Sequence, residues 1–184
     1  MKNRLSTLLL CFLMVTAVFA DLPFRNHRYD GFRVLKVTPD NIVFVGNSIT
    51  NMHEWWEAFD NPAIINRGTS GAVSDELLAN LESVIAGKPK KIFLMIGTND
   101  LGTAGINNTE HVVGNLEKIL DRIRHESPAT EIYVQSILPC NKDLNLLTRT
   151  NAAIEETCGR HEGVMFINLW DDLIGVRNGQ NSLD

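Results

Sequence analysis

The sequence has little cysteine, few aromatic residues and no excess of basic charge. Cysteines number three among 184 residues, and aromatic residues make up 7%. Acidic residues outnumber basic ones by 22 to 17, and the one basic cluster is Lys88, Lys90 and Lys91. A chain of this charge is a poor candidate for binding a polyanion, so we expect no nucleic-acid partner.

Sequence patterns that hold cofactors are also missing. The sequence shows no metal-ligand spacing of histidine and cysteine, no phosphate-binding loop and no dinucleotide fingerprint. We therefore expect chemistry without a metal ion or a cofactor. No internal repeat, low-complexity tract or linker follows Asp21.

The apolar run at 8–18 is too short for a comfortable membrane span, which takes about 20 residues. It follows the basic residues Lys2 and Arg4, and small residues surround Ala20. This order is typical of a secretory signal peptide. We predict that residues 1–20 are a signal peptide cleaved after Ala20, and that the protein is secreted or periplasmic.

An uncleaved N-terminal anchor is the alternative, and attachment of a lipid through Cys11 is a weaker one, because leucines precede it where small residues are needed. Without residues 1–20 the chain has 164 residues, a net charge near −7 and no membrane span. We expect residues 21–184 to form one domain.

Short apolar runs alternate with amphipathic segments along this domain. We expect strands at 42–45, 63–65, 92–96, 132–134 and 164–167, and helices at 51–59, 74–86, 109–127 and 143–158. Ser74 and Thr109 are the expected N-caps, and 21–40 is expected to be an irregular lead-in. Near-continuous apolar strands separated by helices are typical of a parallel, doubly wound three-layer α/β sheet.

This layout also separates the two remaining cysteines. Cys140 follows the fourth strand, whereas Cys158 ends the helix that runs back, about 20 Å away at 1.5 Å per residue. Bridged cysteines have α-carbons within about 7 Å. We expect two free thiols.

Ligands of open α/β sheets bind beyond the carboxyl ends of the strands, where small and polar residues gather in this sequence. The segments there are Gly46-Asn47-Ser48-Ile49-Thr50, Asn66-Arg67-Gly68-Thr69-Ser70-Gly71, Gly97-Thr98-Asn99-Asp100 and, after the fifth strand, Asp184.

These segments resemble the blocks of the SGNH (GDSL-like) hydrolases. Residues 46–50 are similar to the nucleophile block, with Asn47 in place of the usual Asp, and 97–100 match the third block. Gly68 falls where we expect the second-block glycine, and 182–184 are similar to the start of a last block, Asp-x-x-His. The resemblance implies a five-stranded sheet of order 2-1-3-4-5. It also implies that this chain is incomplete, lacking the histidine and a final helix.

The resemblance implies a role for each residue. Ser48 would be the nucleophile, and Asp184 would orient the missing histidine. The main-chain N–H groups of Ser48 and Gly68 and the side-chain amide of Asn99 would form the oxyanion hole. Taken singly, Ser48 could instead be a helix cap, Gly68 a turn glycine and Asn99 a turn residue.

Four of the five histidines of the printed chain are not expected to serve as the base. His53 is turned away on the helix after Ser48, and His161 precedes the fifth strand at the opposite edge. His111 and His125 fall on the helix after the third block, and the position of His27 is open. The chain as printed is therefore expected to be nearly inactive.

The resemblance implies a serine ester hydrolase that removes acetyl or short acyl groups, with carbohydrate O-acetyl esters as the expected substrate and an acyl-enzyme as intermediate. A lysophospholipase or thioesterase of the same fold is the enzymatic alternative. A non-catalytic carbohydrate-binding domain is the alternative from another class, and a flavodoxin-type cofactor binder is disfavoured because the first loop lacks a phosphate-cradling run. We also expect one face of the sheet, covered only by 51–59, to expose apolar side chains.

Overall fold

The computed structural model describes residues 24–102, 108–177 and 180–183. The chain divides into two units, residues 1–35 and 36–184, which are described separately.

The described part of the first unit is a helix at 24–34, so the expectation of an irregular segment there was wrong. Neighbours three and four positions apart account for it. The guanidinium of Arg28 lies 5.0 Å from the centre of the Phe32 ring, and Tyr29 meets the same ring edge-on. Asp30 and Arg33 form an ion pair at 2.7 Å. Such pairs support a helix.

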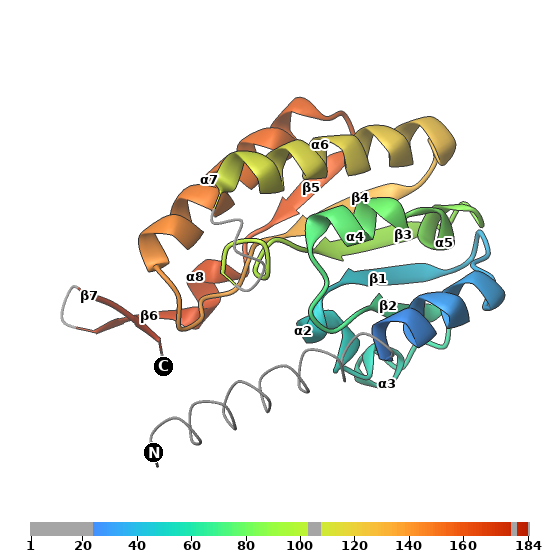
Figure 1. Cartoon of the computed structure of the whole chain (residues 1–184), viewed down its shortest axis with the longest axis horizontal. Helices are drawn as coiled ribbons and strands as arrows, with labels where there is room; N and C mark the ends of the chain where they lie inside the picture. Colours follow the sequence, from blue (N-terminus) through green and yellow to red (C-terminus); the bar gives the residue numbers. More distant parts are fainter. Residues whose placement is uncertain (1–23, 103–107, 178–179, 184) are drawn as a thin grey trace, which may run out of the picture. The chain divides into compact units, whose positions relative to one another are not determined.

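The second unit is built on a five-stranded, all-parallel sheet of order β2-β1-β3-β4-β5 (Figure 1). This confirms the expected topology. The strands are β1 (Ile42–Gly46), β2 (Ile64–Gly68), β3 (Lys91–Met95), β4 (Glu131–Gln135) and β5 (Val164–Ile167). Each lies within two or three residues of its expected position.

Four helices pack on one face of the sheet: α4 (Ser74–Ala79), α5 (Glu82–Ile85), α6 (Thr109–Glu126) and α7 (Leu144–Arg160) (Figure 1). Their buried stripes meet the inward side chains of the strands, among them Val43, Ile92 and Ile132, which have no solvent exposure. Burial of each large aliphatic side chain contributes about 1.5–3 kcal/mol before the entropy cost of ordering it.

The segment after β1 forms two short helices, α2 (Ser48–Asn51) and α3 (Trp55–Ala58), rather than the single helix expected at 51–59. Side chains compete for the carbonyls that a continuous helix would use. The amide of Asn66 donates to the carbonyls of Thr50, Asn51 and His53, and the indole N–H of Trp55 also donates to Thr50. The break thus depends on a residue of β2.

The helix N-caps also differ from those expected. Asn108, not Thr109, caps α6, because its side-chain oxygen accepts from the N–H groups of Glu110 and His111. Val73, not Ser74, is the N-cap of α4. The hydroxyls of Thr109 and Ser74 bond instead to side chains far along the chain, Thr150 and Asp100.

Three further elements follow β5. Helix α8 (Trp170–Leu173) leads into an antiparallel hairpin of β6 (Ile174–Arg177) and β7 (Gln180–Leu183). No helix or strand was expected after the fifth strand.

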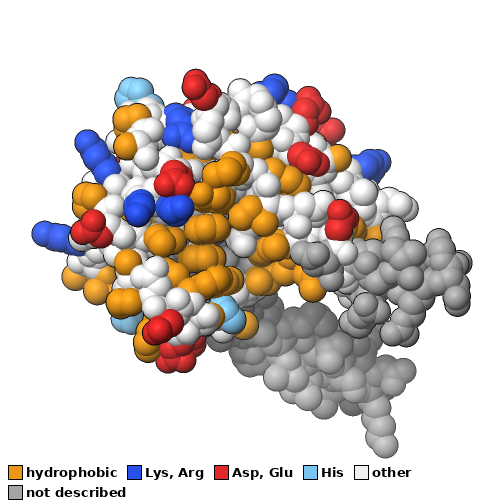
Figure 2. Space-filling model, turned by 180° about the vertical axis from the view of Figure 1, so that it is seen from behind, with side chains coloured by type: hydrophobic (Ala, Val, Ile, Leu, Met, Phe, Trp, Pro, Cys, Tyr) orange, Lys and Arg blue, Asp and Glu red, His pale blue; other side chains and the backbone are white. Residues whose placement is uncertain are grey.

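The face of the sheet opposite α4–α7 carries a row of aromatic side chains. Phe44, Phe93 and Tyr133 stand in register on β1, β3 and β4, with ring centres 4.7 and 4.6 Å apart. Trp55 of α3 stacks on Phe44 at 4.2 Å, whereas Met165, next in register on β5, is 47% exposed. Hydrophobic side chains gather on this side of the molecule (Figure 2). The expected exposure of apolar sheet is therefore present at β5.

Cys140 and Cys158 are both free, as expected. Burial raises the pKa of the Cys158 thiol to about 11, so it stays protonated and unreactive at neutral pH. Over the residues that the structure describes, no helix is both long and apolar enough to cross a membrane. The proposed signal peptide at 1–20 lies outside those residues.

Candidate active site

Ser48 lies at the carboxyl end of β1, where it is the first residue of α2. The preceding residue, Asn47, is buried and caps the helix: its side-chain oxygen accepts from the N–H of Ile49 at 3.0 Å. Because Asn47 performs the capping, the Ser48 hydroxyl is not used for it. Ser48 is half-buried, and among the described residues no side chain is hydrogen-bonded to its hydroxyl. The side chain is therefore available for chemistry.

Asn99 follows β3 at the same edge of the sheet. Its side-chain nitrogen donates to the carbonyl of Ala72 at 2.9 Å, which connects the loop after β3 to the loop after β2. A carboxamide nitrogen carries two hydrogens, so one remains for another acceptor. Asn99 is thus held by a neighbouring loop, and among the described residues its second amide hydrogen has no acceptor.

Gly68 is buried at the end of β2, and its N–H already has an acceptor, the side-chain oxygen of Asn66 at 2.8 Å. A Cβ at this position would lie 2.3 Å from the main-chain nitrogen of Asn51, so only glycine lets α2 pack on β2. Gly71, three residues later in the same loop, is exposed and has a φ of +74°. Of these two glycines, Gly68 is the one that the resemblance places in the oxyanion hole.

Asp184, the expected partner of a histidine, lies outside the described residues. Three described histidines of the second unit, His53, His111 and His161, contact other groups. The ring of His53 packs edge-on against Trp55 at 4.3 Å, and that of His161 bonds the carbonyl of Thr157. None of the histidines in the described ranges is hydrogen-bonded to Ser48.

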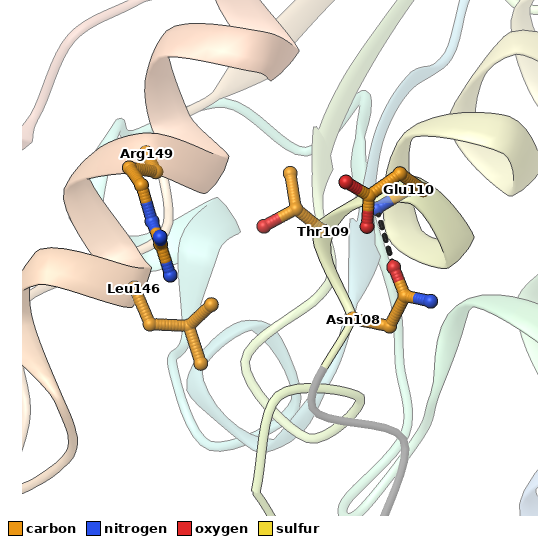
Figure 3. Close-up of a pocket in the computed structure, with 5 residues that line it drawn as sticks. All are labelled: Asn108, Thr109, Glu110, Leu146 and Arg149. Atoms are coloured by element: carbon orange, nitrogen blue, oxygen red, sulfur yellow. Dashed lines mark hydrogen bonds between the residues drawn. The ribbon is translucent and has the colours of Figure 1, made fainter.

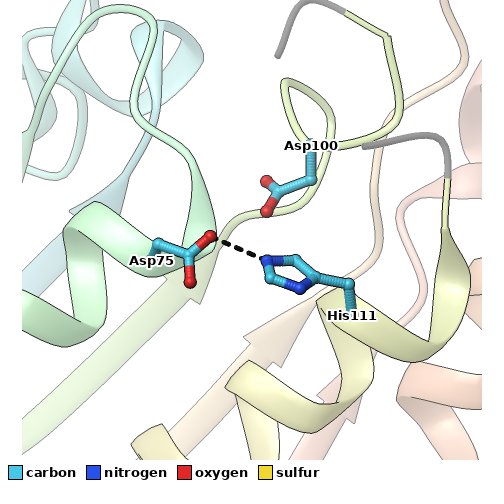
Figure 4. Close-up of side chains that lie close together, drawn as sticks. All are labelled: Asp75, Asp100 and His111. Carbon is cyan, nitrogen blue, oxygen red and sulfur yellow. Dashed lines mark hydrogen bonds and ion pairs between the residues drawn. The ribbon is translucent and has the colours of Figure 1, made fainter. Parts of the chain in front are cut away.

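His111 belongs to a cluster with Asp75 and Asp100 (Figure 4). The three side chains could in principle ligate a metal ion, but their atoms are already committed to one another and to neighbours. The ring Nε2 of His111 lies 2.7 Å from Asp75, and Asp100 accepts from both the N–H and the hydroxyl of Ser74. The pKa of the Asp75 carboxyl is lowered, mainly by its hydrogen bond with His111 and also by the one from Asn115. The arrangement is that of a polar network.

A pocket of about 440 Å³ opens between the N-terminal ends of α6 and α7. Arg149 and Leu146 lie on its α7 side, and Asn108, Thr109 and Glu110 on its α6 side (Figure 3). Because α6 follows β3 and α7 follows β4, both helices begin at the carboxyl edge of the sheet, as does α2 with Ser48. The pocket therefore opens at the same edge as the nucleophile.

Comparisons with solved structures agree with this fold. A Streptococcus pneumonia protein, provisionally assigned as a platelet activating factor, is 28% identical, with a TM-score of 0.82 over 94% of this chain and 86% of its own. An acetylxylan esterase from Geobacillus stearothermophilus gives 16% identity and a TM-score of 0.59 over 74% and 80% of the two chains. A carbohydrate esterase family 3 protein from Talaromyces cellulolyticus gives 17% and 0.58 over 79% and 88%.

A search of curated proteins gives no match. The sequence model of the GDSL-like lipase/acylhydrolase family, however, matches residues 44–183, which include Ser48, the loop after β2 and Asn99. A match over this much of the chain, together with the sheet order and the edge position of Ser48, shows that the protein belongs to the GDSL-like lipase/acylhydrolase family.

Proposed function

We propose that this protein is a serine ester hydrolase that removes acetyl or short acyl groups from carbohydrate O-acetyl esters. The observation that carries the proposal is the position of Ser48 at the carboxyl end of β1, with its hydroxyl unused by the helix cap. Asn99 and the loop after β2 are joined at the same edge, which supports an oxyanion hole beside it.

In the proposed reaction the Ser48 oxygen attacks the acyl carbon and its proton passes to a base. The carbonyl oxygen becomes an oxyanion, and the bond to the alcohol breaks as the base returns the proton to it. Water then attacks the acyl-enzyme, releasing the acid and restoring the Ser48 hydroxyl. Asp184 is proposed to orient the base.

The donors proposed for the oxyanion are the N–H of Ser48, the amide of Asn99 and one N–H from the loop after β2. Gly68 was the expected residue in that loop. The N–H of Gly68 already donates a hydrogen bond to the side-chain oxygen of Asn66, whereas Gly71 is exposed and has a left-handed backbone. These contacts favour Gly71 as the third donor, with Gly68 kept for packing.

The pocket between α6 and α7 supports a sugar as the alcohol part of the substrate. Asn108, Glu110 and Arg149 supply amide, carboxylate and guanidinium groups, which suit the hydroxyls of a glycan, and Leu146 supplies an apolar surface. The two carbohydrate-directed structural relatives agree with this substrate class.

A short-chain phospholipid is the second candidate substrate, because the Streptococcus pneumonia relative is named for platelet activating factor. That lipid also carries an acetyl ester, so the same acyl chemistry would serve. Comparing hydrolysis of an acetylated xylooligosaccharide with that of an acetylated phosphocholine lipid separates the two.

The test is the substitution Ser48→Ala, compared with the wild-type protein. Loss of the nucleophile should lower kcat on 4-nitrophenyl acetate by about 10⁴-fold or more, with the melting temperature unchanged. Ser83→Ala is the control, since Ser83 lies on α5 and its hydroxyl only bonds the carbonyl of Asn80. Substantial activity in folded Ser48→Ala would refute the proposal, and glycan binding without hydrolysis in the wild type would favour the binding-domain alternative.

A further inference from the structure

The loops after β2 and β3 are joined at two places. The first is the hydrogen bond from Asn99 to the carbonyl of Ala72. The second joins Asp100, which follows Asn99, to Ser74, which is two residues after Ala72. There Asp100 accepts from the main-chain N–H of Ser74 at 3.0 and 3.2 Å, and also from the Ser74 hydroxyl. Asn99 is therefore held through its own amide and through the next residue.

Asp100 and Ser74 have no solvent exposure. A carboxylate in such a place is costly unless donors surround it, so Asp100 strongly favours the arrangement in which Ser74 supplies them. Since Ser74 is the first residue of α4, this contact fixes the start of α4 relative to the loop that carries Asn99.

A third element, α6, completes the network. Asn115 is buried to 3% exposure, and its side-chain nitrogen donates to the Ser74 hydroxyl at 2.9 Å and to Asp75 at 3.0 Å. Because the Ser74 oxygen accepts from Asn115, its own hydrogen is directed to Asp100. His111, one turn earlier on α6, bonds Asp75 at the outer end of the network.

From these contacts we infer that Ser74 and Asn115 are positioning residues of the oxyanion hole. They act through Asp100 on the neighbouring Asn99, and they fix the separation between the loop after β2 and the Asn99 amide. The inference rests on the proposed function. Oxyanion donors must be held within about 0.5 Å of their productive positions, and a misplacement of about 1 Å costs up to 10²-fold in rate. A network that fixes the position of the Asn99 amide therefore affects the rate of the reaction.

A double-mutant cycle distinguishes positioning from plain stability. In the complete protein, Ser74→Ala should lower kcat on 4-nitrophenyl acetate by roughly 10- to 100-fold per folded molecule, with KM changed less than about twofold. In an Asn99→Ala background the same substitution should lower kcat little further, because the amide it positions is gone. A merely structural role would lower the melting temperature in both backgrounds and leave kcat per folded molecule unchanged.

Asn115→Ala serves as a second variant if Ser74→Ala does not fold, since it leaves the contacts between Ser74 and Asp100 in place. A smaller loss of kcat, again absent in the Asn99→Ala background, is expected. Arg122→Ala is the matched control: Arg122 joins α6 to Glu82 and to the carbonyl of Leu78, at the other end of the helix. It should lower stability without changing kcat.

Unchanged kcat in both folded variants would overturn the inference, as would equal losses in the wild-type and Asn99→Ala backgrounds. These outcomes leave the proposed function standing if Ser48→Ala is inactive. Conversely, an active Ser48→Ala enzyme would refute the proposed function, and the inference with it.

Discussion

At the scale of single residues, position 47 is the one that departs from the family pattern at the nucleophile, with Asn where Asp is usual. In the structure the oxygen of the Asn47 side chain caps α2, and an Asp oxygen has the same geometry and acceptor capacity. The substitution therefore preserves the cap that places Ser48 at the start of the helix. It removes one negative charge beside the position where the oxyanion is proposed to form.

Asn99 gives a prediction at this scale. Asn99→Ala should lower kcat by about 10²–10³-fold with little change in KM, because the donor acts on the charge that develops in the transition state. The substitution also removes the bond to the Ala72 carbonyl, so a modest fall in melting temperature is expected. Steady-state kinetics and thermal melting on the same samples check both effects. A folded Asn99→Ala enzyme with wild-type kcat would contradict the assignment.

At the scale of the secondary-structure elements, helix α2 is held in place by contacts with β2. Its residue Asn51 lies against Gly68 of β2. The side-chain amide of Asn66, on the same strand, donates hydrogen bonds to the carbonyls of the last two residues of α2. The helix that begins with Ser48 is therefore positioned by β2 rather than by its own four residues.

Substitution of the two glycines tests this division of roles. Gly68→Ala should destabilise the fold by about 1–3 kcal/mol, because its Cβ would overlap the backbone of α2. Gly71→Ala should cost about 1–2 kcal/mol through its left-handed backbone. Chemical denaturation measures both. If Gly71 is the donor, kcat per folded molecule falls more for Gly71→Ala; the reverse order would return the role to Gly68.

At the scale of the whole molecule, the two faces of the sheet are covered unequally. Helices α4–α7 bury one face, whereas on the other α3 covers Phe44 and Met165 of β5 is left 47% exposed. Exposed apolar patches of this kind mark interfaces or promote self-association.

We therefore predict that the 184-residue chain binds an apolar dye and self-associates at high concentration. Met165→Lys should reduce both dye fluorescence and the associated fraction in sedimentation, because it places a charge beside the aromatic row. Leu173→Lys is the control, since Leu173 is similarly exposed, at 45%, but lies on α8. Equal effects of the two substitutions would show that the sheet face carrying Met165 is not the surface that binds the dye and self-associates.

The sequence by itself determined the strand positions, the carboxyl-edge location of Ser48 and Asn99, and the two free thiols. Strand positions follow from apolar runs, and the edge location follows from the alternation of strands and helices, so both are local properties that survive without coordinates. The sheet order followed from the resemblance to the family and is confirmed by the pairing of the strands.

Only the tertiary structure decided how the polar side chains are used. Ser74 has the sequence of an N-cap, yet its hydroxyl donates to Asp100, 26 residues away, because a buried carboxylate needs that donor more than the helix does. Likewise, the resemblance points to Gly68 as the oxyanion glycine, and only the approach of Asn51 shows that a glycine is needed there for packing. Such choices depend on contacts between distant segments, which form when the sheet and its helices pack.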